Sequence, residues 1–290
     1  MLPIPLVTLA LGTAVLAVAL ASFAAAPRGG RFRGLPGWVG FWALFAPLLL
    51  LLSRAHPFLS LPLLGVLMFV ALREYFFLAP LRPRDRWVIL AAYLSIPLAL
   101  WPGFHGSRAL FFAGVPMVLF VLIPVLLALA HPQTGLFESA GRVLVGVIAF
   151  VFCAAHLGLM VRGFDHGEIE LFGILVLASE LPQRLLGRVK PGVDLVRPVL
   201  GIAAGVGIAS ALGAALGPLS ELARPQGALV GLAVSLGSSA GAFLAEGMAQ
   251  ELNLGGATSR FGRGAFLDRT FPAVYAAPVF FHCITIMASR

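Results

Sequence analysis

Long apolar runs alternate with short polar breaks along the whole chain. Most of these runs approach or exceed the roughly 20 apolar residues that a helix needs to cross a bilayer. They are too long and too evenly apolar for the strands of a membrane barrel. We therefore predict an all-α polytopic membrane bundle with about ten transmembrane helices. The predicted spans are residues 2–25, 37–53, 57–78, 87–103, 109–130, 143–161, 168–187, 198–219, 227–249 and 270–289.

Composition supports a membrane protein. Of the 290 residues, 60% are hydrophobic and 11% are charged, and the mean hydropathy is +0.99. Soluble domains carry about 25% charged residues. No polar linker is long enough to separate soluble domains, so we predict a single integral-membrane domain over residues 1–290. Its N-terminal helices occupy 1–140 and its C-terminal part 168–290.

The net charge of +8 would suit a nucleic-acid-binding protein, but its distribution points elsewhere. With ten alternating spans, fifteen of the twenty Lys and Arg residues fall in one set of loops. The positive-inside rule places that set in the cytoplasm and both termini outside. We expect an integral protein of the bacterial inner membrane and no nucleic-acid partner. The acidic segment "RGFDHGEIE" (162–170) is then an outer loop, expected to be solvated and without chemistry.

Glycine is frequent in the second half of the chain, with fifteen between residues 191 and 264. Gly237, Gly241 and Ala245 recur at four-residue spacing, which lets membrane helices approach closely. The same pattern would let a backbone approach a ligand. Helix packing alone accounts for it, and we favour that interpretation.

Charged residues near a span are costly and are therefore functional candidates. Glu180, Gln183, Arg184 and Gly187 share one face of the seventh span. They indicate either an intrahelical Glu180–Arg184 pair or a polar face lining a cavity open to the cytoplasm. Pro182 is expected to kink or end the helix there.

Two further residues, His156 and Asp268, are of types that can act as ligands. His156 lies alone within an apolar span, with no second metal ligand near it in sequence, so we expect it to be a packed, hydrogen-bonded residue. Asp268 follows the glycine-rich turn "GRGAF" and precedes the last span. It is either the N-cap of that helix, with Thr270 as a rival, or an oxygen ligand for Mg²⁺ among Arg260, Arg263 and Arg269.

The segment "GRGAFLDRTFPAVYAAPVFFH" (262–282) resembles the C-terminal signature of the phosphatidate cytidylyltransferases, or CDP-diacylglycerol synthases. Three further stretches resemble the family in the same order. "LREYFFLAPLRPRDRWVILAAYLSIPLALW" is similar to its Arg-Glu-Phe segment, and "VFCAAHLGLM" to its middle helices. "SELPQRLLGR" is similar to an Asn-Asp-x-x-Gln-Tyr-x-x-Gly-Lys stretch, which sets Glu180 on the Asp and Gln183 on the Gln. The resemblance runs from about residue 70 to the end.

The resemblance implies a reaction in which CTP and phosphatidic acid form CDP-diacylglycerol and pyrophosphate, a step of phospholipid biosynthesis. It implies Mg²⁺ held by Asp268 and Glu180, with Asp268, Arg269 and Glu180 as catalytic residues. Arg197, Arg263, Gln183 and Arg260 would bind the substrates. The partners would be CTP and phosphatidic acid or another anionic lipid, and a homodimer is left open.

Several family positions are occupied differently here. Arg197 replaces a lysine, Arg263 replaces the signature histidine and Phe271 replaces its final aspartate. The Lys-Asp pair of the family falls on Leu254 and Gly255. A non-catalytic relative that binds an anionic lipid or a membrane partner is the alternative expectation.

Overall fold

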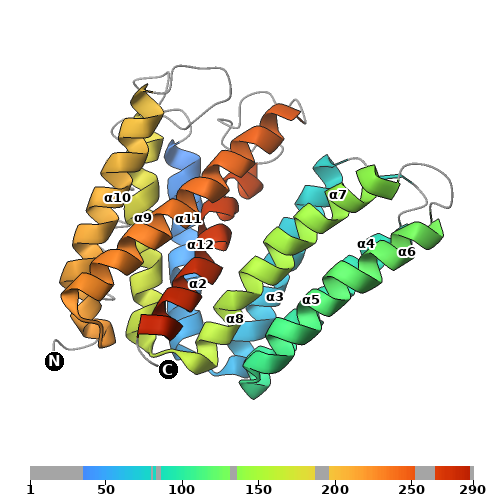
Figure 1. The fold of residues 1–290 in the computed structure, drawn as a ribbon, viewed down its shortest axis with the longest axis horizontal. Helices are drawn as coiled ribbons and strands as arrows, with labels where there is room; N and C mark the ends of the chain where they lie inside the picture. Colours follow the sequence, from blue (N-terminus) through green and yellow to red (C-terminus); the bar gives the residue numbers. More distant parts are fainter. Residues whose placement is uncertain are drawn as a thin grey trace. The chain divides into compact units, whose positions relative to one another are not determined.

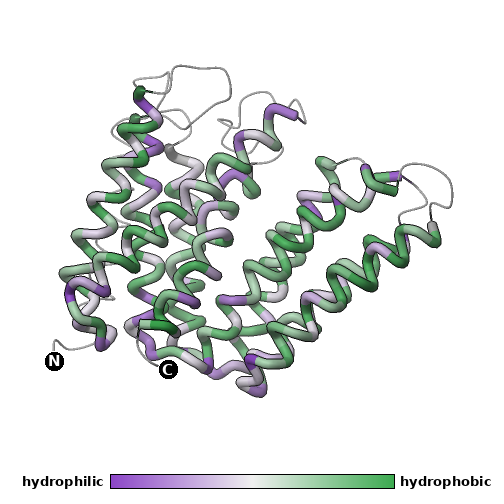
Figure 2. The backbone as a smooth tube through the Cα atoms, viewed as in Figure 1, coloured by the Kyte–Doolittle hydropathy of each residue, from purple (hydrophilic) through white to green (hydrophobic). Residues whose placement is uncertain are grey.

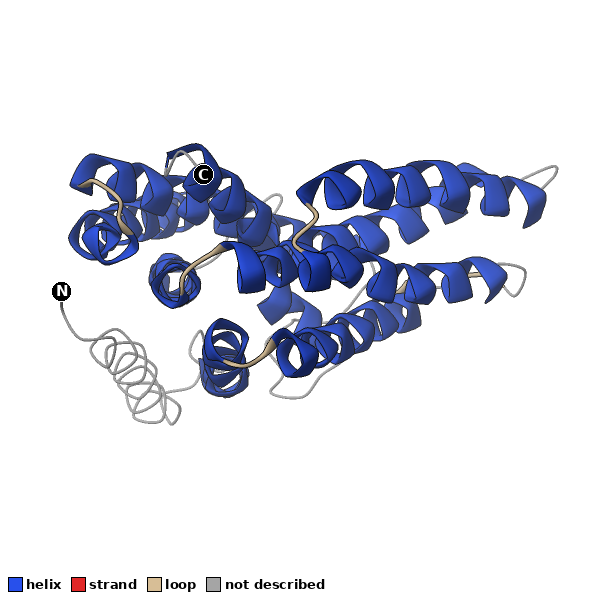
Figure 3. Ribbon diagram, turned by 90° about the horizontal axis from the view of Figure 1, so that it is seen from below, coloured by secondary structure: helices blue, strands red, loops and turns tan. Residues whose placement is uncertain are grey.

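The computed structural model describes residues 35–79, 81–82, 86–130, 136–186, 196–251 and 265–287. Within these ranges the chain forms helices joined by short turns, and no strand (Figures 1 and 3). The fold is therefore all-α. The predicted span 2–25 lies outside the described ranges.

The helices follow the predicted spans closely. Their bounds are α2 (Leu35–Arg54), α3 (Pro57–Leu78), α4 (Arg86–His105), η4 (Leu110–Gly114), α5 (Val115–Met117), η5 (Val118–Leu122), α6 (Ile123–Ala130), α7 (Leu136–Val147), η6 (Ile148–Cys153), α8 (Ala154–Gly163), α9 (His166–Leu186), α10 (Val196–Leu216), η7 (Gly217–Ser220), α11 (Arg224–Glu251) and α12 (Ala265–Met287). The elements from η4 to α6 form one continuous helix with π-helical turns, and α7, η6 and α8 form another.

Eight helices in the described part are long and apolar enough to cross a membrane. Figure 2 shows hydrophobic residues along most of their length and hydrophilic residues mainly towards their ends. The protein is thus a polytopic membrane bundle. The predicted span 168–187 corresponds to α9, which is not among the eight because Glu168, Glu170, Glu180 and Arg184 all lie within its 21 residues.

The chain divides into two compact units, one of residues 1–54 with 164–290 and one of residues 55–163. Helix α2, which we grouped with the N-terminal helices, belongs to the same unit as the helices after residue 164. A single integral-membrane domain over residues 1–290 remains a prediction.

Helix α9 is the centre of the first unit. It contacts α2, α10, α11 and α12, and nearly every residue from Glu168 to Gln183 is buried. Neighbouring helices cover its charges: Arg54 at the end of α2 forms an ion pair with Glu170 at 2.8 Å. A charge-bearing helix can lie within this bundle because its neighbours shield it from lipid.

Glycine lets these helices touch. A Cβ atom at Gly205 of α10 would lie 2.7 Å from the carbonyl oxygen of Ser179 on α9, and one at Gly241 of α11 would collide with the carbonyl of Phe271 on α12. At Gly237 it would lie 3.3 Å from the carbonyl oxygen of Tyr275. The packing interpretation of the Gly237/Gly241 spacing is confirmed.

The second unit consists of α3, α4, the helix from η4 to α6, and the helix from α7 to α8. The Tyr75 hydroxyl donates to the Arg142 carbonyl at 2.7 Å and joins α3 to α7. His156 is buried, packs edge-on against Phe111 and Phe152, and its Nδ1 lies 2.9 Å from the Phe152 carbonyl oxygen. This confirms the prediction of a packed, hydrogen-bonded histidine.

Three local predictions are corrected, wholly or in one of their alternatives. The acidic segment at 162–170 is not a solvated loop: α9 begins at His166, Glu168 and Glu170 are buried, and the Glu168 carboxylate accepts from the Asp165 backbone N–H at 2.9 Å. This contact has the form of a capping box. Pro182 does not end α9, which continues to Leu186, and a kink at Pro182 stays a prediction. Proline is tolerated where neighbouring groups satisfy the freed backbone.

The third concerns the start of the last helix. α12 begins at Ala265, so Asp268 lies in its first turn and neither Asp268 nor Thr270 is its N-cap. The Thr270 hydroxyl donates to the Phe266 carbonyl at 3.0 Å, as a threonine inside a helix does.

Candidate functional site

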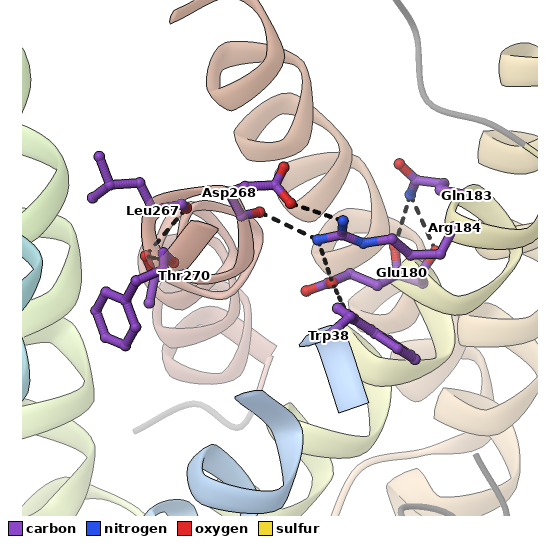
Figure 4. A network of polar contacts seen from close by, with 9 residues as sticks. Trp38, Glu180, Gln183, Arg184, Leu267, Asp268 and Thr270 are labelled. Atoms are coloured by element: carbon purple, nitrogen blue, oxygen red, sulfur yellow. Dashed lines mark hydrogen bonds and ion pairs between the residues drawn. The ribbon is translucent and has the colours of Figure 1, made fainter. Parts of the chain in front are cut away.

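A buried charged cluster joins α2, α9 and α12 in the first unit (Figure 4). We call Trp38, Glu180, Arg184 and Asp268 the α2–α9–α12 cluster. Trp38 comes from the first turns of α2, Glu180 and Arg184 from the last turns of α9, and Asp268 from the first turn of α12. The cluster therefore lies where one end of each helix meets.

Arg184 is the central group of the cluster. Its Nη1 donates to Asp268 Oδ2 at 2.8 Å and its Nη2 donates to the Asp268 backbone carbonyl at 3.3 Å. The same Nη2 lies 3.9 Å from Glu180 Oε2, one helical turn back on α9. One guanidinium thus engages two carboxylates that are far apart in the sequence.

Trp38 fixes the second carboxylate. Its indole N–H donates to Glu180 Oε2 at 2.5 Å. Glu180 is 1% exposed and Asp268 is 6% exposed, so both carboxylates are removed from solvent. A buried carboxylate is stable only with charged or hydrogen-bonding partners. Asp268 also gains from its place near the positive end of the α12 dipole.

Of the two interpretations of the Glu180 face, the intrahelical ion pair is confirmed, and a polar face that lines a cytoplasmic cavity stays a prediction. The intrahelical Glu180–Arg184 ion pair forms, but the shorter contact of Arg184 is with Asp268 on another helix. The Gln183 side-chain amide donates to Ser239 Oγ on α11 at 2.9 Å and to the Ser179 carbonyl on its own helix α9 at 3.1 Å. Gly187 lies outside the described residues.

Gln183 belongs to a buried hydroxyl cluster between α9 and α11. Ser179 Oγ and Ser235 Oγ are 2.8 Å apart, and Ser239 Oγ donates to the Ser235 carbonyl at 2.7 Å. Gln183 is 4% exposed. The Gln183 side-chain amide therefore links α9 to α11.

Arg197, an expected substrate ligand, is not brought into the cluster. Arg197 is exposed in the first turn of α10 and forms no hydrogen bond or ion pair with the described residues. Arg269, expected as a catalytic residue, is half-buried on α12 next to Asp268 in the sequence. Arg260 and Arg263 lie outside the described residues, so their placement as phosphate ligands remains a prediction.

Glu180 and Asp268 were expected to hold Mg²⁺. Here Arg184 engages both of them, and Trp38 holds Glu180. Mg²⁺ needs oxygen ligands at about 2.0–2.1 Å in octahedral geometry, so it cannot share that position with a guanidinium. In the part of the chain that the structure describes, no group of three His, Cys, Asp or Glu residues could hold a metal ion. As arranged, these residues do not fit a divalent ion.

Two residues of the α2–α9–α12 cluster, Arg184 and Trp38, were not among the predicted site residues. Arg184 was expected to pair with Glu180, but nothing in the sequence shows that it reaches Asp268. Trp38 near the start of a span is typical of a residue at the membrane interface, and that signal does not indicate a carboxylate partner. Trp42, one turn further along α2, packs edge-on against Trp38 with ring centroids 6.4 Å apart.

Comparison with known proteins adds one relative. No protein-family model and no solved structure matches the chain. Over 241 residues, 78% of this chain, it is 25% identical to the uncharacterized protein YnbB of Escherichia coli (strain K12), of which the alignment covers 79%.

Proposed function

We propose that this protein is a divergent membrane member of the phosphatidate cytidylyltransferase family, which makes CDP-diacylglycerol and pyrophosphate from CTP and phosphatidic acid. One observation carries the proposal. Glu180 and Asp268 match the family's carboxylates in two separate motifs, and both contact the guanidinium of Arg184. Two motifs that were assigned independently thus contribute to one buried cluster.

In the proposed reaction, a phosphate oxygen of the lipid attacks the α-phosphorus of CTP. A new P–O bond forms and the bond to pyrophosphate breaks. The chain's own contribution would be cationic: arginine binds phosphate oxygens through paired N–H donors. Arg184 and Arg269 lie beside Asp268, and Arg197 lies in the first turn of α10. We assign no step to a metal ion.

The α2–α9–α12 cluster also supports a second candidate function. Arg184 already neutralises Asp268, and the carboxylates do not fit a metal ion as arranged. A non-catalytic relative that binds the phosphate of an anionic lipid would need a buried arginine and no metal. This candidate predicts lipid binding that depends on Arg184 but no nucleotidyl transfer.

The test is an assay of CTP-dependent CDP-diacylglycerol formation. The purified protein, in detergent with phosphatidic acid and Mg²⁺, is compared with Asp268→Asn and with Glu170→Gln. Glu170 is the matched control, because it is an equally buried carboxylate on α9 whose partner is Arg54. Product formation by the wild type and Glu170→Gln, lost in Asp268→Asn, supports the proposal.

Absence of product under conditions that activate a relative with the complete family motifs would refute the catalytic proposal. Binding to nanodiscs then separates what remains. Retention on phosphatidic acid but not on phosphatidylcholine, weakened by Arg184→Gln, would favour the non-catalytic alternative.

A further inference from the structure

Arg184 stands between the two carboxylates that the family resemblance assigns to a metal. Its Nη1 is 2.8 Å from Asp268 Oδ2 and its Nη2 is 3.9 Å from Glu180 Oε2. The second contact of Nη2, 3.3 Å from the Asp268 backbone carbonyl, fixes the plane of the guanidinium. Figure 4 shows Arg184 reaching from α9 towards Asp268, with Glu180 and Trp38 beneath it.

Arg184 supplies the positive charge that a metal ion would otherwise supply to the two carboxylates. Two buried carboxylates repel each other and need a cation close to both. A guanidinium supplies a positive charge that can face both carboxylates through its planar set of N–H donors. Arg184 is only 12% exposed, so its charge acts in a poorly screened environment.

A tethered cation also differs from a metal ion in how it is lost. A bound metal dissociates into solution, whereas the arginine is part of α9 and stays at the carboxylates. Trp38 holds Glu180 from the opposite side through its indole N–H. The contacts of Arg184 and Trp38 therefore leave the two carboxylates poorly disposed to converge on a second cation.

We infer that the guanidinium of Arg184 takes the place of a divalent cation between Glu180 and Asp268. The α2–α9–α12 cluster then binds no divalent metal in the resting protein. For a phosphate-bearing substrate the inference rests on the proposed function: the phosphate meets a fixed arginine instead of a bound metal at this position. Removing the arginine should expose a latent metal site.

Mn²⁺ binding tests this inference, with Mn²⁺ as a paramagnetic probe for sites that accept Mg²⁺. Electron paramagnetic resonance measures free and bound Mn²⁺ in the purified full-length protein. The samples are the wild type, Asp268→Asn, Arg184→Met, Arg184→Lys and Arg184→Met/Asp268→Asn. Methionine keeps an unbranched apolar stem and removes the charge, while lysine keeps the charge. Monodispersity in size-exclusion chromatography checks that each variant is folded.

We expect the wild type and Arg184→Lys to show no Mn²⁺ site that depends on Asp268. Arg184→Met should bind Mn²⁺ about tenfold or more tightly than the wild type, and adding Asp268→Asn should abolish the gain. A wild-type Mn²⁺ site lost in Asp268→Asn would overturn the inference, and this comparison stands even if Arg184→Met does not fold. A folded Arg184→Met protein without added Mn²⁺ binding would also overturn it.

The outcome is separable from that of the proposed function. The Mn²⁺ experiment does not measure CDP-diacylglycerol formation. An inactive protein with the expected Mn²⁺ pattern would therefore refute the proposed activity and support the inference that Arg184 replaces a metal ion. An active protein with an Asp268-dependent Mn²⁺ site in the wild type would do the reverse.

Discussion

Charged residues on α9 contact partners on neighbouring helices. Glu170 pairs with Arg54 of α2, and Arg184 pairs with Asp268 of α12. Glu180 accepts from Trp38 of α2 and lies beside Arg184. An ionised group without such partners is costly in a bilayer, so these contacts allow α9 to keep its charges at the centre of the unit.

Residue types could be predicted better than residue partners. Helical periodicity alone set Glu180 and Arg184 on one face, and the ion pair between them forms. The contact between Arg184 and Asp268 depends on how α9 and α12 pack, and no local pattern encodes that. The same holds for Gln183, whose face was predicted but whose partners on α11 were not.

A comparison of Trp38 with Trp42 measures how much one hydrogen bond contributes to the free energy of unfolding. Both are buried in α2, but only the Trp38 indole N–H has a partner, whereas the Trp42 Nε1 has none among the described residues. Both Trp→Phe changes remove similar packing. We expect Trp38→Phe to lower the free energy of unfolding by about 1–3 kcal/mol more than Trp42→Phe, because it also removes a donor to a carboxylate. Unfolding by SDS in mixed micelles measures this; equal losses would contradict the role of Trp38.

At the scale of elements, helix existence followed from hydropathy but helix ends did not. α3 begins and ends where the apolar run does, whereas α12 begins five residues before its predicted span. The earlier start puts Asp268 inside the helix, with its side chain available to Arg184. Residues 265–269, Ala-Phe-Leu-Asp-Arg, mix apolar and charged side chains, so hydropathy does not mark where the helix begins. Asp268 was predicted as a site residue, but its place inside the helix was not.

Close approach of α11 and α12 predicts different effects for two glycines of α11. A methyl group at Gly241 would collide with the α12 backbone, while one at Gly247 would meet open space. We expect Gly241→Ala to destabilise the protein by about 1–3 kcal/mol through overpacking. Gly247→Ala should be neutral or stabilising by up to about 1 kcal/mol, from helix propensity. Thermal unfolding in detergent compares them, and a Gly241→Ala variant as stable as the wild type would contradict the packing.

At the scale of the whole molecule, the all-α membrane class follows from the apolar runs, and eight membrane-length helices are present in the described part. α9 shows the limit of that reasoning. By its composition, α9 has too many charged residues to be recognised as a membrane span. It is nevertheless buried, because it packs against four other helices. Hydropathy describes a segment by itself and contains no information about its neighbours.

The positive-inside rule predicts the orientation of the whole chain. Glu138 and Arg162 are exposed at opposite ends of the continuous α7–α8 helix, so single cysteines at these positions report both sides. With Cys153 and Cys283 replaced by alanine, a membrane-impermeant maleimide should label Arg162→Cys in intact cells. It should label Glu138→Cys only after permeabilisation. The reverse pattern would place the basic loops outside the cell.

The proposed cytidylyltransferase activity is tested most directly by the transfer of label from α-labelled CTP into extractable lipid. The variants to compare are Glu180→Gln and Glu170→Gln. Both changes neutralise a buried carboxylate of α9, but only Glu180 belongs to the α2–α9–α12 cluster. We expect the wild type and Glu170→Gln to transfer label, and Glu180→Gln to lower transfer about 100-fold, because loss of this carboxylate would misplace Arg184. Equal transfer by the two variants, or none by the wild type where a relative with complete motifs is active, would contradict this expectation.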